Sequence, residues 1–269
     1  MVVRITDDFD LRKICDSGQC FRCMPIENSI YRFISGEHVL YIQQADLTEY
    51  KISCSSTEWE QIWFPYFDLG RSYRSIREQA INDPFLARAA AYGKGIRILR
   101  QDPWETLISF IISQQKTIPA IRTVIEKLSC KCGELITAGP EEVYTFPSPA
   151  AVREADLKEL KLGYREKYVK AAALHLCEQP DLPGLWETLG DESLLHALKE
   201  LYGVGDKIAN CVMLFAYGRT ACAPVDTWIH KIIEKEYQGR NPFPGIGENA
   251  GIVQQYAFYY AQRHKGDFK

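Results

Sequence analysis

The sequence lacks the features that mark several broad classes of protein. It has no apolar run that approaches the length of a membrane-spanning helix, its first residues do not form a signal peptide, and it has no internal repeat or low-complexity tract. These absences argue against an integral membrane protein, a secreted protein and a repeat protein. We therefore expect a soluble intracellular protein, located in the cytoplasm or nucleoid if the source is prokaryotic.

A disulfide framework and a complete metal-binding motif are also missing. The nine cysteines are an odd number in no disulfide-like pattern, which suits a reducing compartment. Cys20-x-x-Cys23 and Cys130-x-Cys132 could each be half of a zinc site, but no second pair of ligands completes either one. Small buried thiols are the preferred interpretation of both pairs.

Positive charge is not in excess. The 32 lysines and arginines face 35 acidic residues, and the net charge of −3 argues mildly against nucleic-acid binding, because such domains are usually basic. However, the acidic residues concentrate in a few stretches, namely Glu58–Glu60, Glu141–Glu142, Asp156–Glu159 and Glu187–Glu192. Other surfaces can therefore be basic, and composition alone leaves nucleic-acid binding open.

Two parts of the 269-residue chain differ in their pattern. Before about residue 65, the runs Ser29–Ser35 and His38–Gln43 are rich in β-branched and aromatic residues and are separated by Gly36-Glu37, a hairpin signal. The later part carries helix signals. We predict an α+β fold, with an N-terminal antiparallel sheet subdomain over residues 1–83 and a mostly helical body over residues 84–269.

Helix starts in the second part are marked by capping carboxylates. Asp83-Pro84 and Asp102-Pro103 each place an aspartate before a proline at the first helical position, and Asp226 precedes an apolar stripe that includes Trp228. The predicted helices cover residues 72–80, 84–92, 103–112, 118–128, 150–160, 165–176, 193–201, 206–217, 227–237 and 249–264, and a further short helix begins at Asp181-Leu-Pro183.

The stretch Leu201-Tyr-Gly-Val-Gly-Asp-Lys-Ile-Ala-Asn-Cys211 joins two of these helices. Gly203 is a helix-ending signal and Gly205 precedes the next helix, so residues 193–217 form a predicted helix–hairpin–helix. A turn at Gly203, Val204 and Gly205 lets the backbone approach another molecule closely, and amide groups at the helix start face an anion. A nucleic-acid phosphate is the obvious candidate.

Lys207 and Asp226 are the candidate catalytic pair. Lys207 lies in the first turn of the second helix, where the helix dipole disfavours a positive charge, and Asp226 follows a loop over residues 218–228 that brings the chain back. A lysine nucleophile beside a fixed carboxylate suits displacement at a sugar carbon, followed by a Schiff base. The alternatives are a solvated lysine on an ordinary hairpin and a capping aspartate without a partner.

These residues resemble a known family. Leu201-x-Gly-Val-Gly-x-Lys207 followed by Val225-Asp226 is similar to the helix–hairpin–helix DNA glycosylases, with their glycine-rich loop and essential aspartate. Further blocks in family order narrow the resemblance to the 8-oxoguanine DNA glycosylases and extend it from about residue 9 to 264. They are Ser17-Gly-Gln-Cys-Phe-Arg22, Leu99-Arg-Gln-Asp-Pro103, Ser109-Phe-Ile111, Leu162-Gly-Tyr-Arg165, Cys211 and Gln254 to Phe258.

The resemblance implies a role for each matching residue in excision. It implies that Lys207 attacks the deoxyribose C1′ with the help of Asp226, and that the carbonyl of Gly18 accepts the N7–H that distinguishes 8-oxoguanine from guanine. Cys211 and Phe258 would sandwich the flipped base, and Gln254 would read its Watson–Crick edge. Without the family, Phe258 would be taken for core and Gln254 for a surface residue.

A second group is implied to act at the vacated position in the duplex. Tyr164 matches the wedge, while Arg165, Arg263 and Gln115 match residues that contact the orphaned cytosine. Gln115 replaces an asparagine of the eukaryotic members, so the resemblance does not fix the preference for cytosine. Trp228 replaces a histidine beside the catalytic aspartate, and its place on the apolar stripe suits a core residue.

The resemblance also implies cofactors and partners. A monovalent cation at the backbone carbonyls of Lys199, Leu201 and Val204 would be structural, and only Cys211 and Cys222 follow the hairpin, which excludes an iron–sulfur cluster. No cofactor and no catalytic metal are expected. The expected partner is duplex DNA that contains 8-oxoguanine, and the protein is expected to be a monomer. Two alternatives stay open, a glycosylase for alkylated purines and a non-catalytic DNA-binding module.

Overall fold

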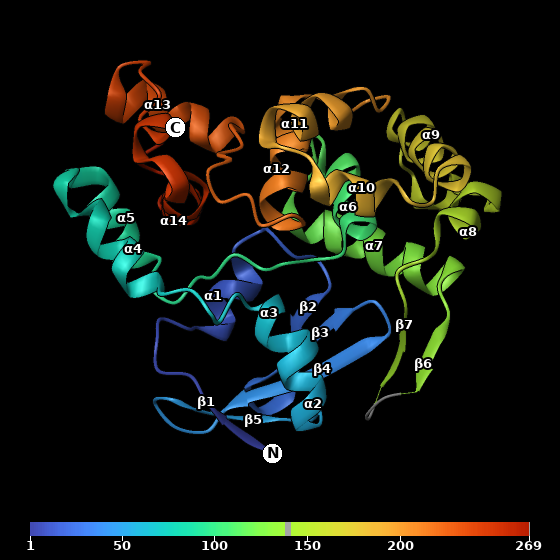
Figure 1. The fold of residues 1–269 in the computed structure, drawn as a ribbon, viewed down its shortest axis with the longest axis horizontal. Helices are drawn as coiled ribbons and strands as arrows, with labels where there is room; N and C mark the ends of the chain where they lie inside the picture. Colours follow the sequence, from blue (N-terminus) through green and yellow to red (C-terminus); the bar gives the residue numbers. More distant parts are fainter. Residues whose placement is uncertain (138–140, 269) are drawn as a thin grey trace.

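The computed structural model describes residues 1–137 and 141–268, with a sheet at one end and helices over the rest (Figure 1). The sheet has five antiparallel strands in the order β1-β5-β4-β3-β2. Their bounds are β1 Val2–Arg4, β2 Cys23–Pro25, β3 Ile30–Ser35, β4 His38–Gln44 and β5 Glu49–Ile52. The predicted α+β class, with an N-terminal antiparallel sheet followed by a helical body, is therefore confirmed.

The sheet forms because its central hairpin buries large apolar side chains. β3 and β4 pair from Ile30↔Gln43 to Ser35↔His38, and Gly36 adopts the left-handed conformation that the tight turn requires (φ +58°). Phe33 and Leu40, which face each other across the hairpin, are fully buried. They join Trp63 and Phe67, from a helical segment that covers the sheet, in a separate hydrophobic core.

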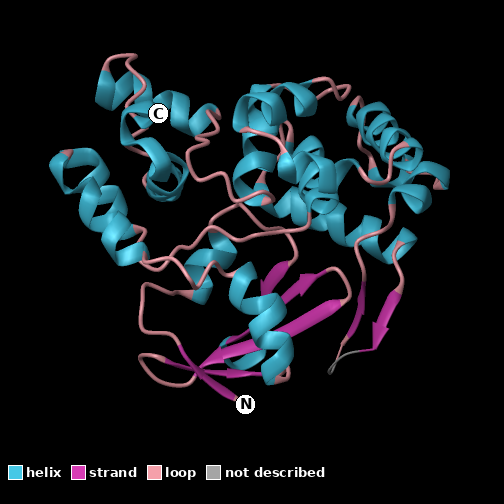
Figure 2. Cartoon of the chain, in the orientation of Figure 1, coloured by secondary structure: helices cyan, strands magenta, loops and turns pink. Residues whose placement is uncertain are grey.

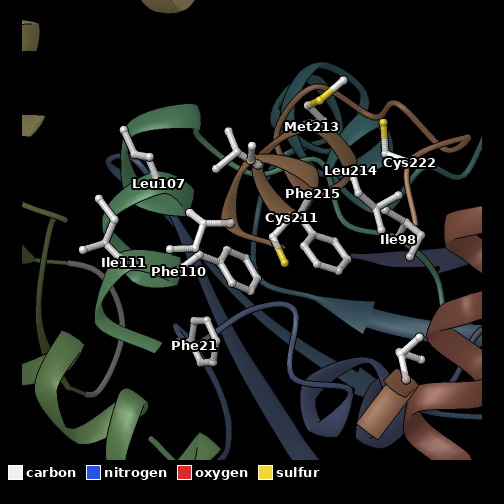
Figure 3. Packing of buried hydrophobic residues seen from close by; sticks show 14 of the residues in the cluster. Phe21, Ile98, Leu107, Phe110, Ile111, Cys211, Met213, Leu214, Phe215 and Cys222 are labelled. Atoms are coloured by element: carbon white, nitrogen blue, oxygen red, sulfur yellow. The ribbon is translucent and has the colours of Figure 1, made fainter. Parts of the chain in front are cut away.

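The helical body contains the second and larger core. Its helices are α4 Tyr73–Gln79, α5 Pro84–Tyr92, α6 Pro103–Ser113, α7 Ile118–Cys132, α8 Pro149–Glu154, α9 Arg165–Glu178, α10 Leu182–Thr188, α11 Asp191–Lys199, α12 Asp206–Phe215, α13 Thr227–Tyr237 and α14 Ala250–Arg263. At its centre α6 packs against α12, where Phe110 stacks on Phe215 at 5.5 Å between ring centroids (Figure 3). No helix in the described part of the chain is long and apolar enough to cross a membrane.

Side-chain caps fix the starts of the helices that carry the site. Asp83 accepts hydrogen bonds from Phe85 N and Leu86 N, and Asp102 accepts one from Glu105 N, as the sequence predicts. The predicted helix over 150–160 is wrong in its second half. The carboxylate of Asp156 accepts from Lys158 N, and this local turn replaces helical pairing after Glu154.

Several elements have no counterpart among the predictions. A short helix, α1 Leu11–Asp16, precedes the Ser17–Arg22 loop, and a two-stranded sheet pairs β6 Leu135–Thr137 with β7 Glu142–Tyr144. A 3₁₀ helix over Phe243–Asn249 precedes α14. Figure 2 shows the β6–β7 ribbon standing beside the larger sheet, below the helices.

The boundary predicted after residue 83 stays a prediction. The buried side chains of the sheet core end at Phe67, apart from Leu99. Tyr73 and Ile76 of α4 already belong to the core of the helical body. Along the chain, the change from the sheet core to the core of the helical body therefore falls between Phe67 and Tyr73, before residue 83.

Candidate active site

The hairpin turn between α11 and α12 is shaped by its glycines. Gly203 has φ +88°, and a Cβ there would lie 2.3 Å from the ring of Tyr168, so no other residue fits. Gly205 precedes α12 in extended conformation and offers no side-chain cap to the helix. The N–H groups of the first turn of α12 are thus open to an anion, as predicted.

A cavity of about 1290 Å³ opens beside α12. Most of the predicted site residues line it together, although they come from distant segments. They are Gly18, Gln115, Tyr164, Lys207, Cys211, Asp226, Gln254, Phe258 and Arg263. The cavity is larger than typical small-molecule sites, which suits part of a polymer such as an extruded nucleotide.

Lys207 is the second residue of α12, and its side chain is held within the cavity. Its Nζ lies 3.2 Å from the Oγ of Ser113 and 5.0 Å from the ring centroid of Phe110. The Ser113 hydroxyl donates its own proton to the carbonyl of Phe110 at 2.7 Å. The serine oxygen can therefore only accept a hydrogen bond from the lysine.

Asp226 is the N-cap of α13, as predicted. Its Oδ1 accepts hydrogen bonds from Trp228 N and Ile229 N, both at 2.9 Å. Burial raises the pKa of the Asp226 carboxyl above its ordinary value, and the two amides and Lys207 oppose that rise. The cap alone does not keep this carboxyl at the low pKa of an exposed aspartate, because burial outweighs it.

Cys211 lies one helical turn after Lys207, with its sulfur beside Phe110 and Phe215 (Figure 3). Burial raises the pKa of its thiol to about 11. The side chain is therefore a neutral thiol near pH 7, with an apolar character that suits packing against the face of a base rather than binding a metal.

The Gly18 loop is fixed against α14. Gly18 has φ +78°, and a Cβ there would lie 2.8 Å from Ile118 Cδ1 and 3.3 Å from Phe258 Cε1. Gln255 on α14 donates from Nε2 to the carbonyl of Ser17 at 2.6 Å. Because Gln254, Gln255 and Phe258 share one helix, these contacts set the distance between the Gly18 carbonyl and the side chains of α14 that line the cavity.

Gln254 is buried, and the nitrogen of its side-chain amide is unpaired within the described part of the chain. The side chain lines the cavity, and its Nε2 has no hydrogen-bond partner among the described residues. An unpaired buried donor costs about 1–3 kcal/mol. Such a group is expected where a ligand supplies the missing acceptor.

The residues predicted to act at the orphaned base fall into two places. Arg165 donates from Nε to Gln114 O at 2.7 Å and lies 4.6 Å over the ring of Tyr164, beside Gln115 in a left-handed conformation (φ +52°). Arg263 instead contacts Asp16 at 3.4 Å and the ring of Tyr259 at 3.7 Å. The structure thus groups Gln115, Tyr164 and Arg165, while the contacts of Arg263 lie on the side of the Gly18 loop.

Trp228 follows the capping aspartate by two residues and lies between the main core and the cavity. Its side chain is half-buried, packs against the main core and also lines the cavity. Lys231 lies 5.2 Å over its ring. The prediction that Trp228 packs with the core is confirmed, and the indole is in addition part of the cavity wall.

Ser113, Phe110 and Gln255 are site residues that the sequence reasoning missed. Ser113 and Phe110 are three residues apart on α6, which is the spacing of one helix face. That they lie on the same face can therefore be predicted once the helix is assigned. The contact of Ser113 with a lysine 94 residues later cannot be predicted from the sequence. In the described residues, no three His, Cys, Asp or Glu side chains are grouped to hold a metal.

Comparison with protein families covers residues 2–243, which include every segment of this site except α14. Residues 2–107 match the model of the 8-oxoguanine DNA glycosylase N-terminal domain, and residues 108–243 match that of the HhH-GPD superfamily base excision DNA repair proteins. N-glycosylase/DNA lyase of Saccharomyces cerevisiae is 33% identical over 64% of this chain, a region that spans 50% of the yeast protein. N-glycosylase/DNA lyase of Arabidopsis thaliana is 28% identical over 80% of this chain and 63% of its own length.

Solved structures agree with the family models. The 8-oxoguanine glycosylase/lyase of Clostridium acetobutylicum, in complex with double-stranded DNA containing cytosine opposite 8-oxoguanine, superposes with a TM-score of 0.93. It is 34% identical and covers 98% of this chain and 95% of its own. A 3-methyladenine DNA glycosylase from Archaeoglobus fulgidus shares only the fold, with 14% identity and a TM-score of 0.80. The chain belongs to the HhH-GPD superfamily of base excision DNA repair proteins and, within it, to the 8-oxoguanine DNA glycosylases.

Proposed function

We propose that this protein excises 8-oxoguanine from duplex DNA and then cleaves the strand at the resulting site. The main support is the position of Lys207, which lines the same cavity as Asp226, Cys211, Gln254 and Phe258. A partly buried amine that shares a cavity with a carboxylate suits attack on a carbon that gains positive charge. Relatives that cover nearly the whole chain carry the names of glycosylase/lyases.

The reaction divides into three steps at one sugar. The Nζ of Lys207 bonds to C1′ while the bond from C1′ to the base breaks and the base leaves with the electron pair. Opening of the sugar ring gives an iminium ion between C1′ and the lysine nitrogen. Loss of a C2′ proton then expels the 3′ phosphate by β-elimination, and water releases the lysine. Asp226 stabilises the positive charge that develops in the first two steps.

Proton transfer in the elimination needs a group that the chain does not obviously provide. Cys211 is a neutral thiol with a raised pKa, and Asp226 is held by two amides. The liberated base carries nitrogen atoms that can take and return a proton while it stays in the cavity. We assign the proton shuttle to that base.

Recognition of the lesion is assigned to three segments. The Gly18 carbonyl accepts the N7–H of 8-oxoguanine, the Gln254 amide reads the Watson–Crick edge, and Cys211 and Phe258 hold the two faces of the base. One buried hydrogen bond and the penalty for leaving it unmade amount to about 1–3 kcal/mol. Discrimination from guanine therefore draws also on the energy needed to flip the base.

At the vacated position, Tyr164 fills the stack, and Gln115 and Arg165 contact the orphaned base. Three nitrogens of Arg165 donate to the carbonyls of Gln114 and Leu162, so few of its donors stay available for a base edge. Arg263 reaches the duplex only after leaving Asp16. We expect a weak preference for cytosine opposite the lesion, which excision rates with cytosine, adenine, guanine and thymine would measure.

The protein is proposed to act as a monomer and without a cofactor. A monovalent cation at the carbonyls of Lys199, Leu201 and Val204 would stabilise the hairpin turn and take no part in the reaction. Such a cation is tested by the dependence of DNA affinity on potassium at constant ionic strength.

Borohydride trapping tests the proposed function. The protein is incubated with a duplex containing 8-oxoguanine, borohydride is added, and a covalent protein–DNA adduct is expected with wild type and with Lys51→Gln, a control lysine on the sheet. Lys207→Gln is expected to form no adduct. Absence of an adduct with wild type, or equal trapping by Lys207→Gln, would overturn the proposal.

The same experiment separates the alternatives. A glycosylase for alkylated purines that hydrolyses with water would form no adduct with the 8-oxoguanine duplex. A non-catalytic DNA-binding module would bind the duplex and release no base. Neither alternative has a use for the Lys207 amine placed near Asp226 in a shared cavity.

A further inference from the structure

Three tyrosines form a row on the surface between the cavity and the hairpin. The rings of Tyr164 and Tyr168 meet edge to face at 5.8 Å between centroids, and those of Tyr168 and Tyr202 at 4.8 Å. Tyr164 is 41% exposed and Tyr202 56% exposed, so the two ends of the row face solvent. Large aromatic side chains in such a position are often part of a binding surface.

Lys167 lies over this row. Its Nζ is 5.3 Å from the ring centroid of Tyr168 and 5.3 Å from that of Tyr202. Interaction with the Tyr202 hydroxyl raises the pKa of the Lys167 ammonium, which therefore stays charged. In residues 1–137 and 141–268, no carboxylate forms an ion pair with it. The ammonium thus has aromatic rings on one side and is exposed to solvent on the other.

The row is continuous with the two parts of the site that face DNA. Tyr164 lines the cavity, and the turn of the hairpin rests on Tyr168, because a Cβ on Gly203 would lie 2.3 Å from that ring. Tyr202 is itself the residue before Gly203 in the turn. A strand that runs from the hairpin amides to the cavity must therefore pass close to Lys167.

We propose that Lys167, supported by Tyr168 and Tyr202, is an additional binding site for the phosphodiester backbone of the duplex. The inference rests on the proposed function, since it places the same DNA on the hairpin and at the cavity. The ammonium supplies the charge, and the Tyr202 hydroxyl is a second donor for a phosphate oxygen. The rings hold the lysine ready for contact, which lowers the entropy lost on binding.

Salt dependence of DNA binding measures such a contact directly. Each phosphate neutralised by a lysine contributes about 0.9 to the slope of log affinity against log salt concentration. Lys167→Ala is therefore expected to reduce the magnitude of that slope by about 1 and to weaken binding roughly five- to tenfold near 0.1 M salt. The loss is expected to be equal for a duplex with 8-oxoguanine and an undamaged duplex, because phosphates carry no sequence information.

Two further variants separate charge from packing. Lys167→Arg keeps the charge over the rings and is expected to keep the wild-type slope. Lys51→Ala removes an exposed lysine from β5, at the far end of the molecule from α12 in Figure 1, and is expected to leave slope and affinity unchanged. A thermal unfolding curve for each variant shows that the fold is intact.

Each outcome has one meaning. An unchanged slope for Lys167→Ala, while wild type is trapped on 8-oxoguanine DNA, would overturn this inference and leave the proposed function standing. A loss confined to the damaged duplex would also overturn it, since the contact would then depend on the base. If wild type is neither trapped nor bound, the proposed function itself fails.

Discussion

The hydroxyl of Ser113 lies 3.2 Å from the Nζ of Lys207 and can only accept a hydrogen bond from it, because its proton is donated to the Phe110 carbonyl. A neutral amine that donates one N–H to this oxygen has only two directions left for its lone pair. The aromatic wall at Phe110, stacked on Phe215, limits the other positions of the amine. We therefore expect Ser113 to position the proposed nucleophile.

Removal of this hydroxyl is expected to slow the chemistry and leave DNA binding intact. For Ser113→Ala we expect about tenfold slower single-turnover trapping by borohydride, which corresponds to one hydrogen bond of about 1.4 kcal/mol. Ser113→Thr keeps the hydroxyl and is expected to recover most of the rate. Ser109→Ala, at another buried serine of α6, is the matched control. Equal rates for Ser113→Ala and wild type would show that the serine does not orient the amine.

Substitution of the two neighbouring glutamines of α14 is expected to have opposite effects on the stability of the protein. Gln254 Nε2 is buried without a partner among the described residues, whereas Gln255 Nε2 donates to Ser17 O at 2.6 Å. Gln254→Met removes an unpaired donor and is expected to raise Tm by about 2–4 °C, equivalent to about 1 kcal/mol, while it slows excision. Gln255→Met leaves the Ser17 carbonyl unpaired and is expected to lower Tm by a similar amount.

Differential scanning calorimetry of the free protein, beside single-turnover excision, measures both effects. A fall in Tm for Gln254→Met would show that its amide is satisfied in the free protein. Unchanged excision by that variant would show that the amide does not read the base.

Local chemistry made much of this fold predictable. Asp83, Asp102 and Asp226 cap their helices because the side chain and the amides it binds are two or three residues apart. The turn at Gly203 follows likewise from a backbone conformation that glycine favours. The helix predicted past Glu154 was wrong because Asp156 offers its backbone a competing local bond, which residue periodicity does not show.

The composition of the site could be predicted only in part, because its contacts join distant segments. Gly18 and Phe258 were expected to face the same base, and the cavity that both line agrees with this. The bond from Gln255 to Ser17 spans 238 residues, and no local pattern indicates it. The ion pair of Arg263 with Asp16 was equally hidden, and it separates that arginine from Arg165.

Glu105 is expected to make the stability of the fold depend on pH. It is buried in α6, and burial raises the pKa of its carboxyl from 4.5 to about 8. Below pH 4.5 the folded and unfolded states are both protonated; between about 5 and 7.5 the unfolded state releases the proton while the folded state keeps it. Stability therefore falls as pH rises through this window, by at most about 1.4 kcal/mol per pH unit from this group. Glu105→Gln is expected to remove that slope in urea titrations, and an identical slope in the variant would contradict the assignment.

We expect Asp226 to set the acid limit of excision. Burial raises the pKa of its carboxyl above the ordinary value of 3.8, so the charged form is lost at a higher pH than in an exposed aspartate. If the carboxylate stabilises the positive charge on the sugar, excision must fall as pH decreases through that raised pKa. Asp226→Asn keeps an oxygen for the amides of Trp228 and Ile229 but has no charge to lose. We expect this variant to bind the damaged duplex like wild type, to excise roughly 10²–10³ times more slowly, and to lose the acid limb. Single-turnover rates across pH measure all three; an acid limb that persists in Asp226→Asn would assign it to another group.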